Sequence, residues 1–525
     1  MNDKLAASEE RARTAGRGGV AVLAAKAFFI VIGLVQQTVL PSLIGLAGYG
    51  ALSRVLAVAS VVNNVVVSSS IQGVSRTVAR ARARGAVLEE QALRATLRVH
   101  VPLALGLALA FALAAPLIAR FEGAPHIVLP LVVASGVVAL YGLYAPLVGM
   151  LNGRSQFTRQ AQLDMTFAVL RTFGLLGLGW LFVRRGLPGA LGSLTGFVLA
   201  AACIVPLAAR RAGTGRAGGT NEPEVPSPRR YIAELLPLAL AQLGTNLLMQ
   251  VDITVLGRFL SHGAALAVAV EPEKAADEWV GVYRACQLFA FLPYQLLFSV
   301  TQVLFPMIAR AKSEGDTEAV ARYVARGTRI ATIAGGLMIS VVAAAPEGLL
   351  TFAYGPAIAA RGYETLRILA VGQGAFAMLG VATTVLASLG RERLAATITT
   401  CACAAVCVGC FVTIPSDTFG SLQLRATATA TSVALGLTLI AGVVAVVRVA
   451  GAFVPWRTAA RVGIAVAVAV FAGPMLPHVG RFAVVLLAAA IGVAYVVFLV
   501  ATGELTRADL ADVRGLVGRR AKSGA

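Results

Sequence analysis

Apolar runs of about 20 residues recur along the whole chain, and they leave few ways for it to fold. A helix of that length crosses the hydrocarbon core of a bilayer, since each residue adds about 1.5 Å. Inside lipid every backbone polar group must be bonded within the protein, so only helices and closed barrels span it. A barrel would show short segments that alternate between polar and apolar residues. We therefore predict an all-α polytopic membrane protein with about 14 transmembrane helices.

Composition and charge agree with this class. The chain of 525 residues is 58% hydrophobic and 13% charged, whereas a soluble protein carries about a quarter of charged residues. The net charge of +20 would suggest nucleic acid in a soluble protein. Here most of the 45 Lys and Arg residues lie in alternate loops, which is the positive-inside pattern. We therefore place both termini in the cytoplasm and expect contacts with anionic membrane lipids but not with nucleic acid.

The spans divide the chain into lobes. Residues 1–19 are polar and basic, and the apolar run that follows continues to Leu40, too long for a cleavable signal peptide. The predicted segments are a cytoplasmic tail (1–19), a first lobe of six spans (20–208), a Gly-, Pro- and Arg-rich cytoplasmic linker (209–230), a second lobe of six spans (231–447), two more spans (448–502) and a basic amphipathic cytoplasmic tail (503–525).

One stretch occurs twice and relates the two lobes. Residues 49–85 align with residues 279–315 without a gap, so that Arg54 matches Arg284. The dipeptide Gly153-Arg154 after the fourth span likewise resembles Gly390-Arg391 after the tenth. We therefore predict two parallel six-helix repeats, related by a pseudo-twofold axis along the membrane normal, with a central cavity as in transporters.

Four cations lie inside the predicted spans. Arg54 and Arg284 occupy equivalent positions near the outer surface, where each either snorkels outward or faces the cavity and attracts an anionic substrate. Lys26 lies in the cytoplasmic third of the first span, with the same two interpretations. Arg171 lies deeper, and Asp164 shares its helix face, so it either forms an internal ion pair or binds substrate.

The seventh span carries a polar stripe. Gln242, Asn246 and Gln250 recur at intervals of four residues, and Asp252 follows. Such a stripe either hydrogen-bonds to neighbouring helices or lines a cavity that contacts sugar hydroxyls. Asp252 would either pair with Arg284 or bind a coupling ion, H⁺ or Na⁺.

No motif for a cofactor, a metal or catalysis is present. The chain has neither a phosphate-binding GxxxxGK[ST] loop nor an HExxH sequence. Cys403, Cys407 and Cys410 share one helix face, but no His or carboxylate joins them, so we interpret them as packing residues. We expect no cofactor, no metal site and no catalytic residue.

Several segments resemble a known family. LPSLIGLAGYGALSRVLAVASVVNN in the first lobe and NLLMQVDITVLGRFL and LLTFAYGPAIAARGYETLRILAVGQGAFAMLGVATTVLASLGR in the second are similar to polysaccharide-exporter flippases. These belong to the multidrug/oligosaccharidyl-lipid/polysaccharide superfamily, which includes O-antigen and lipid II flippases. The number of spans matches the lipid II type, whereas the opening of the first lobe resembles the polysaccharide type.

This resemblance implies a function. Such flippases move undecaprenyl-pyrophosphate-linked oligosaccharides across the bacterial inner membrane by alternating access, for lipopolysaccharide, exopolysaccharide or peptidoglycan synthesis. The family's cavity cations bind the pyrophosphate or acidic sugars, and Lys26, Arg54 and Arg284 resemble them by position. The resemblance also implies contact with a glycan polymerase or with glycosyltransferases.

Two alternatives remain open from the sequence. A drug or organic-cation antiporter of the same superfamily would use cavity carboxylates, and the predicted spans contain only Asp164 and Asp252. A membrane-embedded glycan polymerase or transferase is an enzyme of a different class. It would need a large outer loop or an acid in the first outer loop, and the predicted first outer loop (41–48) is uncharged. We therefore expect a transporter rather than an enzyme.

Overall fold

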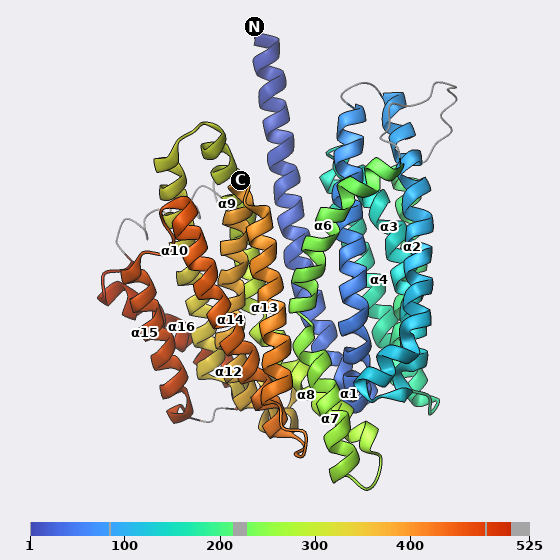
Figure 1. Cartoon of the computed structure of the whole chain (residues 1–525), viewed down its shortest axis with the longest axis vertical. Coiled ribbons are helices and arrows are strands. Elements are labelled where there is room, and N and C mark those ends of the chain that lie inside the picture. The colour runs from blue at the N-terminus through green and yellow to red at the C-terminus, as the bar shows by residue number, and fades with distance from the viewer. Residues whose placement is uncertain (1, 83–85, 214–227, 478–479, 506–525) are drawn as a thin grey trace. The chain divides into compact units, whose positions relative to one another are not determined.

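A computed structural model describes residues 2–82, 86–213, 228–477 and 480–505. These residues form helices joined by short turns, without a β-strand (Figure 1). The side chains of residues 2–27 lie outside the description, as do most of the predicted linker and nearly all of the predicted C-terminal tail.

The helices follow one another closely along the chain. In order they are α1 (Asn2–Arg82), α2 (Ala86–Glu122), the short 3₁₀ turn η1 (Pro125–Ile127), α3 (Val128–Gly153), α4 (Phe157–Arg184), α5 (Gly189–Ala212), α6 (Pro228–Leu248), α7 (Val251–Ala267), α8 (Pro272–Ala290), α9 (Leu292–Ser313), α10 (Thr317–Ala344), α11 (Pro346–Tyr354), α12 (Pro356–Ser388), α13 (Glu392–Thr413), α14 (Ser421–Ala450), α15 (Trp456–Ala472), η2 (Gly473–Met475) and α16 (Ala483–Ala501).

The multi-pass membrane class is confirmed. Within the described ranges, 12 helical segments are long and apolar enough to cross a membrane. The first, Val31–Arg82, has 52 residues and would extend roughly 78 Å, enough for two crossings. The predicted count of about 14 transmembrane helices therefore describes this architecture approximately.

The first two predicted spans are the two parts of α1. Gly45 has φ 76° and ψ 160°, which is not helical, and Figure 1 shows the chain reversing between the two parts. A positive φ of this kind favours glycine, because it has no Cβ. The Tyr49 hydroxyl donates a hydrogen bond of 2.9 Å to Gln37 Oε1 across the bend. The predicted outer loop (41–48) is thus reduced to a bend.

An apolar stripe on α2 faces outward. Leu105, Leu109, Leu113 and Leu117 recur every four residues and are 52%, 61%, 74% and 71% exposed. In water such a stripe would be an aggregation hazard, whereas in a bilayer it is the surface that contacts lipid.

The described chain divides into two compact units. Unit 1 contains residues 1–281 and 416–420, and unit 2 contains residues 282–415 and 421–525. The division falls inside α8, so that α6 and α7 belong to unit 1. The predicted lobes, 20–208 and 231–447, stay a prediction from the sequence repeat.

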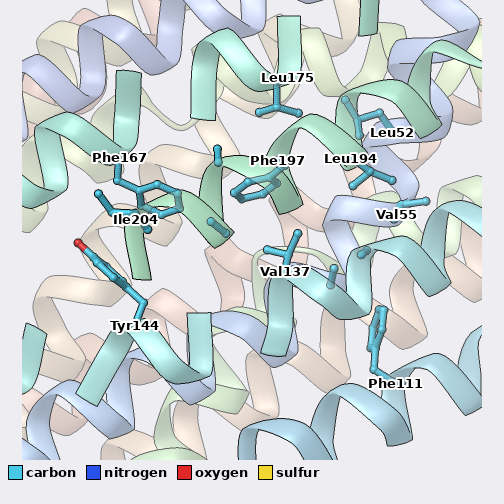
Figure 2. Close-up of a cluster of buried hydrophobic side chains, with 14 of the residues drawn as sticks. Leu52, Val55, Phe111, Val137, Tyr144, Phe167, Leu175, Leu194, Phe197 and Ile204 are labelled. Carbon is cyan, nitrogen blue, oxygen red and sulfur yellow. The ribbon is translucent and has the colours of Figure 1, made fainter. Parts of the chain in front are cut away.

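The core of unit 1 is built from α1 to α5. Figure 2 shows Leu52 of α1, Phe111 of α2, Val137 of α3 and Phe167 of α4 among its buried side chains. Tight contact between α4 and α5 depends on glycine: a Cβ on Gly196 would lie 1.9 Å from the Gly174 carbonyl oxygen. Small residues let membrane helices approach closely, where dispersion and weak polar contacts hold them.

The C-terminal helices α15 and α16 pack with α10 in unit 2. Val462, Tyr495 and Leu499 form a small buried cluster there, and the Tyr495 hydroxyl donates a hydrogen bond of 2.9 Å to the Ile333 carbonyl. Just beyond α16, Glu504 pairs with Arg329 at 2.8 Å and with Arg461 at 2.9 Å. The last two spans are therefore fixed to unit 2 by both apolar packing and charge.

Candidate functional site

Arg54 carries a positive charge that is fully buried. Its side chain is 0% exposed, in the second part of α1. The Nε atom lies 2.8 Å from Asp277 Oδ1 of α8, and Nη1 lies 3.4 Å from Glu122 Oε2 at the end of α2. These side chains converge within unit 1 from three helices that are far apart in the sequence.

His126 extends this cluster toward the surface. Its Nε2 lies 2.7 Å from Asp277 Oδ2, and its Nδ1 lies 2.9 Å from Glu273 Oε2. The imidazole is 30% exposed, whereas Asp277 is 5% exposed. We call Arg54, Glu122, His126, Glu273 and Asp277 the outer charge cluster, because the sequence places them at the predicted outer side.

Glycines allow the backbone to approach this cluster. A Cβ on Gly50 would lie 1.7 Å from the Asp277 carbonyl oxygen, so α1 and α8 touch directly at this point. A Cβ on Gly257 of α7 would lie 2.8 Å from Arg54 Nη1. Any side chain at either position would push the helices or the guanidinium away from their contacts.

The cluster is held at a cost. Removing an Arg and its carboxylates from water is expensive, and only close pairing offsets this. Arg54 Nη2 and Glu122 Oε1 are buried and make no hydrogen bond with the described residues. Buried polar atoms without a hydrogen bond cost about 1–3 kcal/mol each. The pairing is therefore strong but incomplete.

This geometry changes the interpretation of Arg54. The sequence suggests a cavity cation for an anionic substrate, but here carboxylates enclose it, and contact with a substrate would require these ion pairs to open. Sequence reasoning missed the roles of Glu122, His126 and Asp277. The signal was available in part, because Glu273 and Asp277 lie in a polar segment on the same predicted side as Arg54.

Arg284, the repeat partner of Arg54, has different surroundings. It is half-buried on α8 in unit 2, and its Nη1 donates a hydrogen bond of 3.0 Å to Gln287 Oε1 one turn later. Within the described ranges it makes no ion pair. Its positive charge is thus not neutralised by a neighbouring carboxylate.

Arg171 lies half-buried on α4, with its guanidinium carbon 5.9 Å from the centre of the Phe197 ring. The possible partner Asp164 accepts a hydrogen bond of 3.0 Å from the Tyr144 hydroxyl. Lys26 lies within α1, but its side chain lies outside the description. The substrate roles of Arg171 and Lys26 stay predictions.

The polar stripe is interrupted. Gln242 and Asn246 lie on α6, which ends at Leu248, and Gln250 precedes α7. Asn64 Nδ2 donates a hydrogen bond of 2.8 Å to Asn246 Oδ1, so this part of the stripe links α1 to α6. Gln250 Oε1 is buried without a hydrogen bond to the described residues.

Asp252 is 1% exposed in the first turn of α7, where its Oδ1 accepts a hydrogen bond of 2.8 Å from the Ile253 backbone N–H. A carboxylate at a helix N-terminus is stabilised by the exposed N–H groups and the helix dipole. Across the described residues, no group of three or more His, Cys, Asp or Glu side chains is arranged to hold a metal ion.

Comparison with known proteins identifies the family. Residues 16–312 match the family model described as polysaccharide biosynthesis protein, which is more than half of the chain. The chain belongs to the polysaccharide biosynthesis protein family. Residues 274–412 also match the family model named MatE. A search of curated proteins found no match to this sequence.

Solved structures define the fold of this family member. It resembles the lipid II flippase MurJ in an inward closed conformation, with a TM-score of 0.71 and 13% identity over 91% of this chain and 98% of that one. It also resembles an inward-facing multidrug resistance MATE family transporter of the MOP superfamily, with a TM-score of 0.60 and 15% identity over 82% of this chain and 98% of that one. The predicted resemblance to this superfamily is confirmed, and so is the fold class.

Proposed function

We propose that the protein is a flippase that moves a lipid-linked oligosaccharide, carried on undecaprenyl pyrophosphate, across the bacterial inner membrane by alternating access. The observation that carries the proposal is the extent of the likeness. The lipid II flippase fold covers 91% of the chain, whereas the multidrug transporter fold covers 82%. Membership of a polysaccharide biosynthesis family supports a glycan as the cargo.

The charges of the buried residues favour an anionic substrate. The buried carboxylates Glu122 and Asp277 face Arg54, which leaves them poorly suited to an organic cation. Arg284 has a neutral hydrogen-bond partner, Gln287. A half-buried cation of this kind attracts a pyrophosphate more strongly than it would in water.

We assign the predicted site residues the following roles. Lys26, Arg171 and Arg284 contact the pyrophosphate or acidic sugars, and Gln242, Asn246 and Gln250 contact sugar hydroxyls. Arg54 joins them when its ion pairs open. Asp252 remains the candidate for coupling to H⁺ or Na⁺. Both termini lie in the cytoplasm, and a polymerase or glycosyltransferases would hand over or receive the glycan.

The outer charge cluster serves as a latch in this mechanism. It joins Arg54 of the first sequence repeat to Asp277, which lies two residues before the second copy. Its incomplete hydrogen bonding lowers the cost of opening, because the freed groups gain water. The latch is closed when the substrate enters from the cytoplasmic leaflet and open when it leaves.

The test is deletion of the gene followed by mass spectrometry of the membrane lipids. We expect undecaprenyl-linked oligosaccharides to accumulate, and Arg284→Ala to reproduce the accumulation, while the exposed-site control Arg229→Ala restores export. Normal glycan export in the deletion strain would refute the flippase. If the deletion strain instead has normal lipids and is sensitive to organic cations, the result would favour the antiporter. The match to the MatE family model is the reason for testing this alternative.

A further inference from the structure

A surface cavity of about 650 Å³ lies in unit 2, where α13 begins and α14 ends. It is distinct from the outer charge cluster, and its basic residues belong to loops that the sequence places in the cytoplasm. Its lining comprises Gly390, Arg391, Glu392, Arg393, Leu394, Ala441, Val444, Ala445, Arg448 and Val449.

The polar half of this cavity is cationic. Arg391, Arg393 and Arg448 are all exposed, and in the described part of the chain none of them forms an ion pair. No side chain caps the start of α13, so the N–H groups of its first turn also face this end. Three arginines against Glu392 leave an excess of two positive charges.

At the equivalent turn of the first repeat, the arginine is bonded inside the protein. There Arg154 follows the end of α3, forms an ion pair with Glu89, and donates a hydrogen bond to the carbonyl of Ala212, the last residue of α5. Arg82 in turn donates to the Arg154 carbonyl. One internal cation therefore joins three helices.

The structure corrects the sequence register at this turn. Lys312, the repeat partner of Arg82, donates to the Leu389 carbonyl, so Leu389 rather than Arg391 corresponds to Arg154. Gly390, with φ 69°, likewise corresponds to Ser155, with φ 58°. Leucine cannot form the ion pair or the hydrogen bond that Arg154 makes. At this turn the first repeat therefore has an internal salt bridge, whereas the second has a buried leucine, and the cavity begins at the next residue, Gly390.

The apolar half of the cavity continues along α14. Val433, Leu437, Ile440 and Val444 share one helix face and are 55%, 63%, 62% and 43% exposed. An exposed apolar stripe in a membrane helix contacts acyl chains. The stripe ends at Arg448, so a cationic cavity lies at the end of a path for lipid tails.

We propose that this cavity binds the phosphate headgroup of an anionic phospholipid, with the acyl chains along α14. Arginine forks match phosphate oxygens in a bidentate manner, and basic pockets between membrane helices hold such headgroups. This site is independent of the transported substrate.

The test is native mass spectrometry of the full-length protein in detergent, titrated with phosphatidylglycerol, with phosphatidylcholine and with inorganic phosphate. The variant carries Arg391→Gln, Arg393→Gln and Arg448→Gln. A control with the same change in charge carries Arg159→Gln, Arg229→Gln and Arg310→Gln, all exposed and outside the cavity. Equal thermal unfolding temperatures show that all three proteins are folded.

We expect wild type and control to retain phosphatidylglycerol in preference to phosphatidylcholine, and the cavity variant to bind it roughly tenfold more weakly. Leu437→Asn, which leaves the arginines intact, should also weaken retention. Equal binding by the cavity variant and the control would overturn the proposal. Displacement of the lipid by millimolar inorganic phosphate would also overturn it, since the site would then recognise free phosphate.

Discussion

The two copies of the repeated stretch show how one sequence pattern serves two purposes. In the first copy Arg54 is fully buried and enclosed by Glu122 and Asp277. In the second copy Arg284 is half-buried and bonds to Gln287 on its own helix. The same residue type at the same repeat position is thus neutralised in one copy and left charged in the other.

The helices that carry these two arginines also differ in whether they are continuous. The first copy continues as one helix to Arg82, whereas the second is interrupted at Phe291, between α8 and α9. Pro293 accounts for the break, because proline lacks an N–H and clashes with the preceding turn. Asn63 stands at this position in the first copy. The first copy is therefore built for packing, and the second leaves its cation accessible.

The largest expected effect comes from removing the enclosed arginine. Arg54→Ala should destabilise the protein by about 3–5 kcal/mol, because it leaves the buried Glu122 without its cation and Asp277 with His126 alone. Arg284→Ala removes one hydrogen bond of a half-buried side chain and should cost less than about 1 kcal/mol. Thermal unfolding of both variants in detergent measures the difference. Equal unfolding temperatures for the two variants would contradict the conclusion that Arg54 is held by its ion pairs and Arg284 is not.

The close approach of α1 and α8 gives the next effect. Gly50→Ala should cost about 1–3 kcal/mol or more, since the added Cβ would meet the Asp277 carbonyl at 1.7 Å. Gly48→Ala is the matched control, because its Cβ would make an ordinary contact of 3.4 Å with Ile44. If both variants unfold at the wild-type temperature, the helices do not meet as described.

The turns after α3 and α12 sharpen the comparison. Arg154→Gln should cost about 1.5–3 kcal/mol, because it breaks charged hydrogen bonds to Glu89 and Ala212. Arg391→Gln should change stability by less than about 0.5 kcal/mol, as expected for an exposed residue. Chemical or thermal unfolding measures both. A larger loss for Arg391→Gln would mean that it, and not Leu389, replaces Arg154.

A pH effect is expected in unit 2. Burial raises the pKa of Glu504, but hydrogen bonds from Thr458, Arg329 and Arg461 outweigh it, so that the pKa lies below its usual value of 4.5. A carboxylate whose pKa is lower in the folded state stabilises that state at pH values above its pKa in the unfolded chain. This stabilisation is lost as the pH falls through the pKa of the folded state.

Glu504→Gln should therefore cost about 1–2 kcal/mol near pH 7, and the difference from wild type should shrink as the pH falls below 4.5. Unfolding temperatures of both proteins across this range provide the measurement. A difference that stays constant with pH would show that the carboxylate charge does not stabilise this end of α16.

Much of the fold could be predicted from the sequence. Apolar length sets the membrane class, and the gap-free alignment of the duplicated stretch is enough to single out Arg54 and Arg284. The family resemblance rests on scattered Gly, Arg, Asp and Pro positions, and the family model covers those within residues 16–312.

The surroundings of the site could not be predicted, for physical reasons. No sequence pattern near Arg54 or near Asp277 indicates that the two residues pair, because only the packing of α1 against α8 brings them together. The spacing of the polar stripe predicts one helix face, but α6 ends at Leu248 and moves Gln250 into a turn. The two Gly-Arg dipeptides are identical in sequence, but they do not occupy equivalent positions in the structure. The hydrogen bonds at the helix ends show that Leu389 corresponds to Arg154.

The central claim is that Arg284 acts on an anionic lipid-linked glycan while Arg54 is held in the latch. The most direct measurement is transbilayer movement of an undecaprenyl-pyrophosphate oligosaccharide by purified protein in proteoliposomes. We expect transport by wild type, partial transport by Arg284→Lys, and a loss of tenfold or more in Arg284→Gln with unfolding temperature unchanged. Wild-type transport by Arg284→Gln, or movement in empty liposomes at the same rate, would contradict the account.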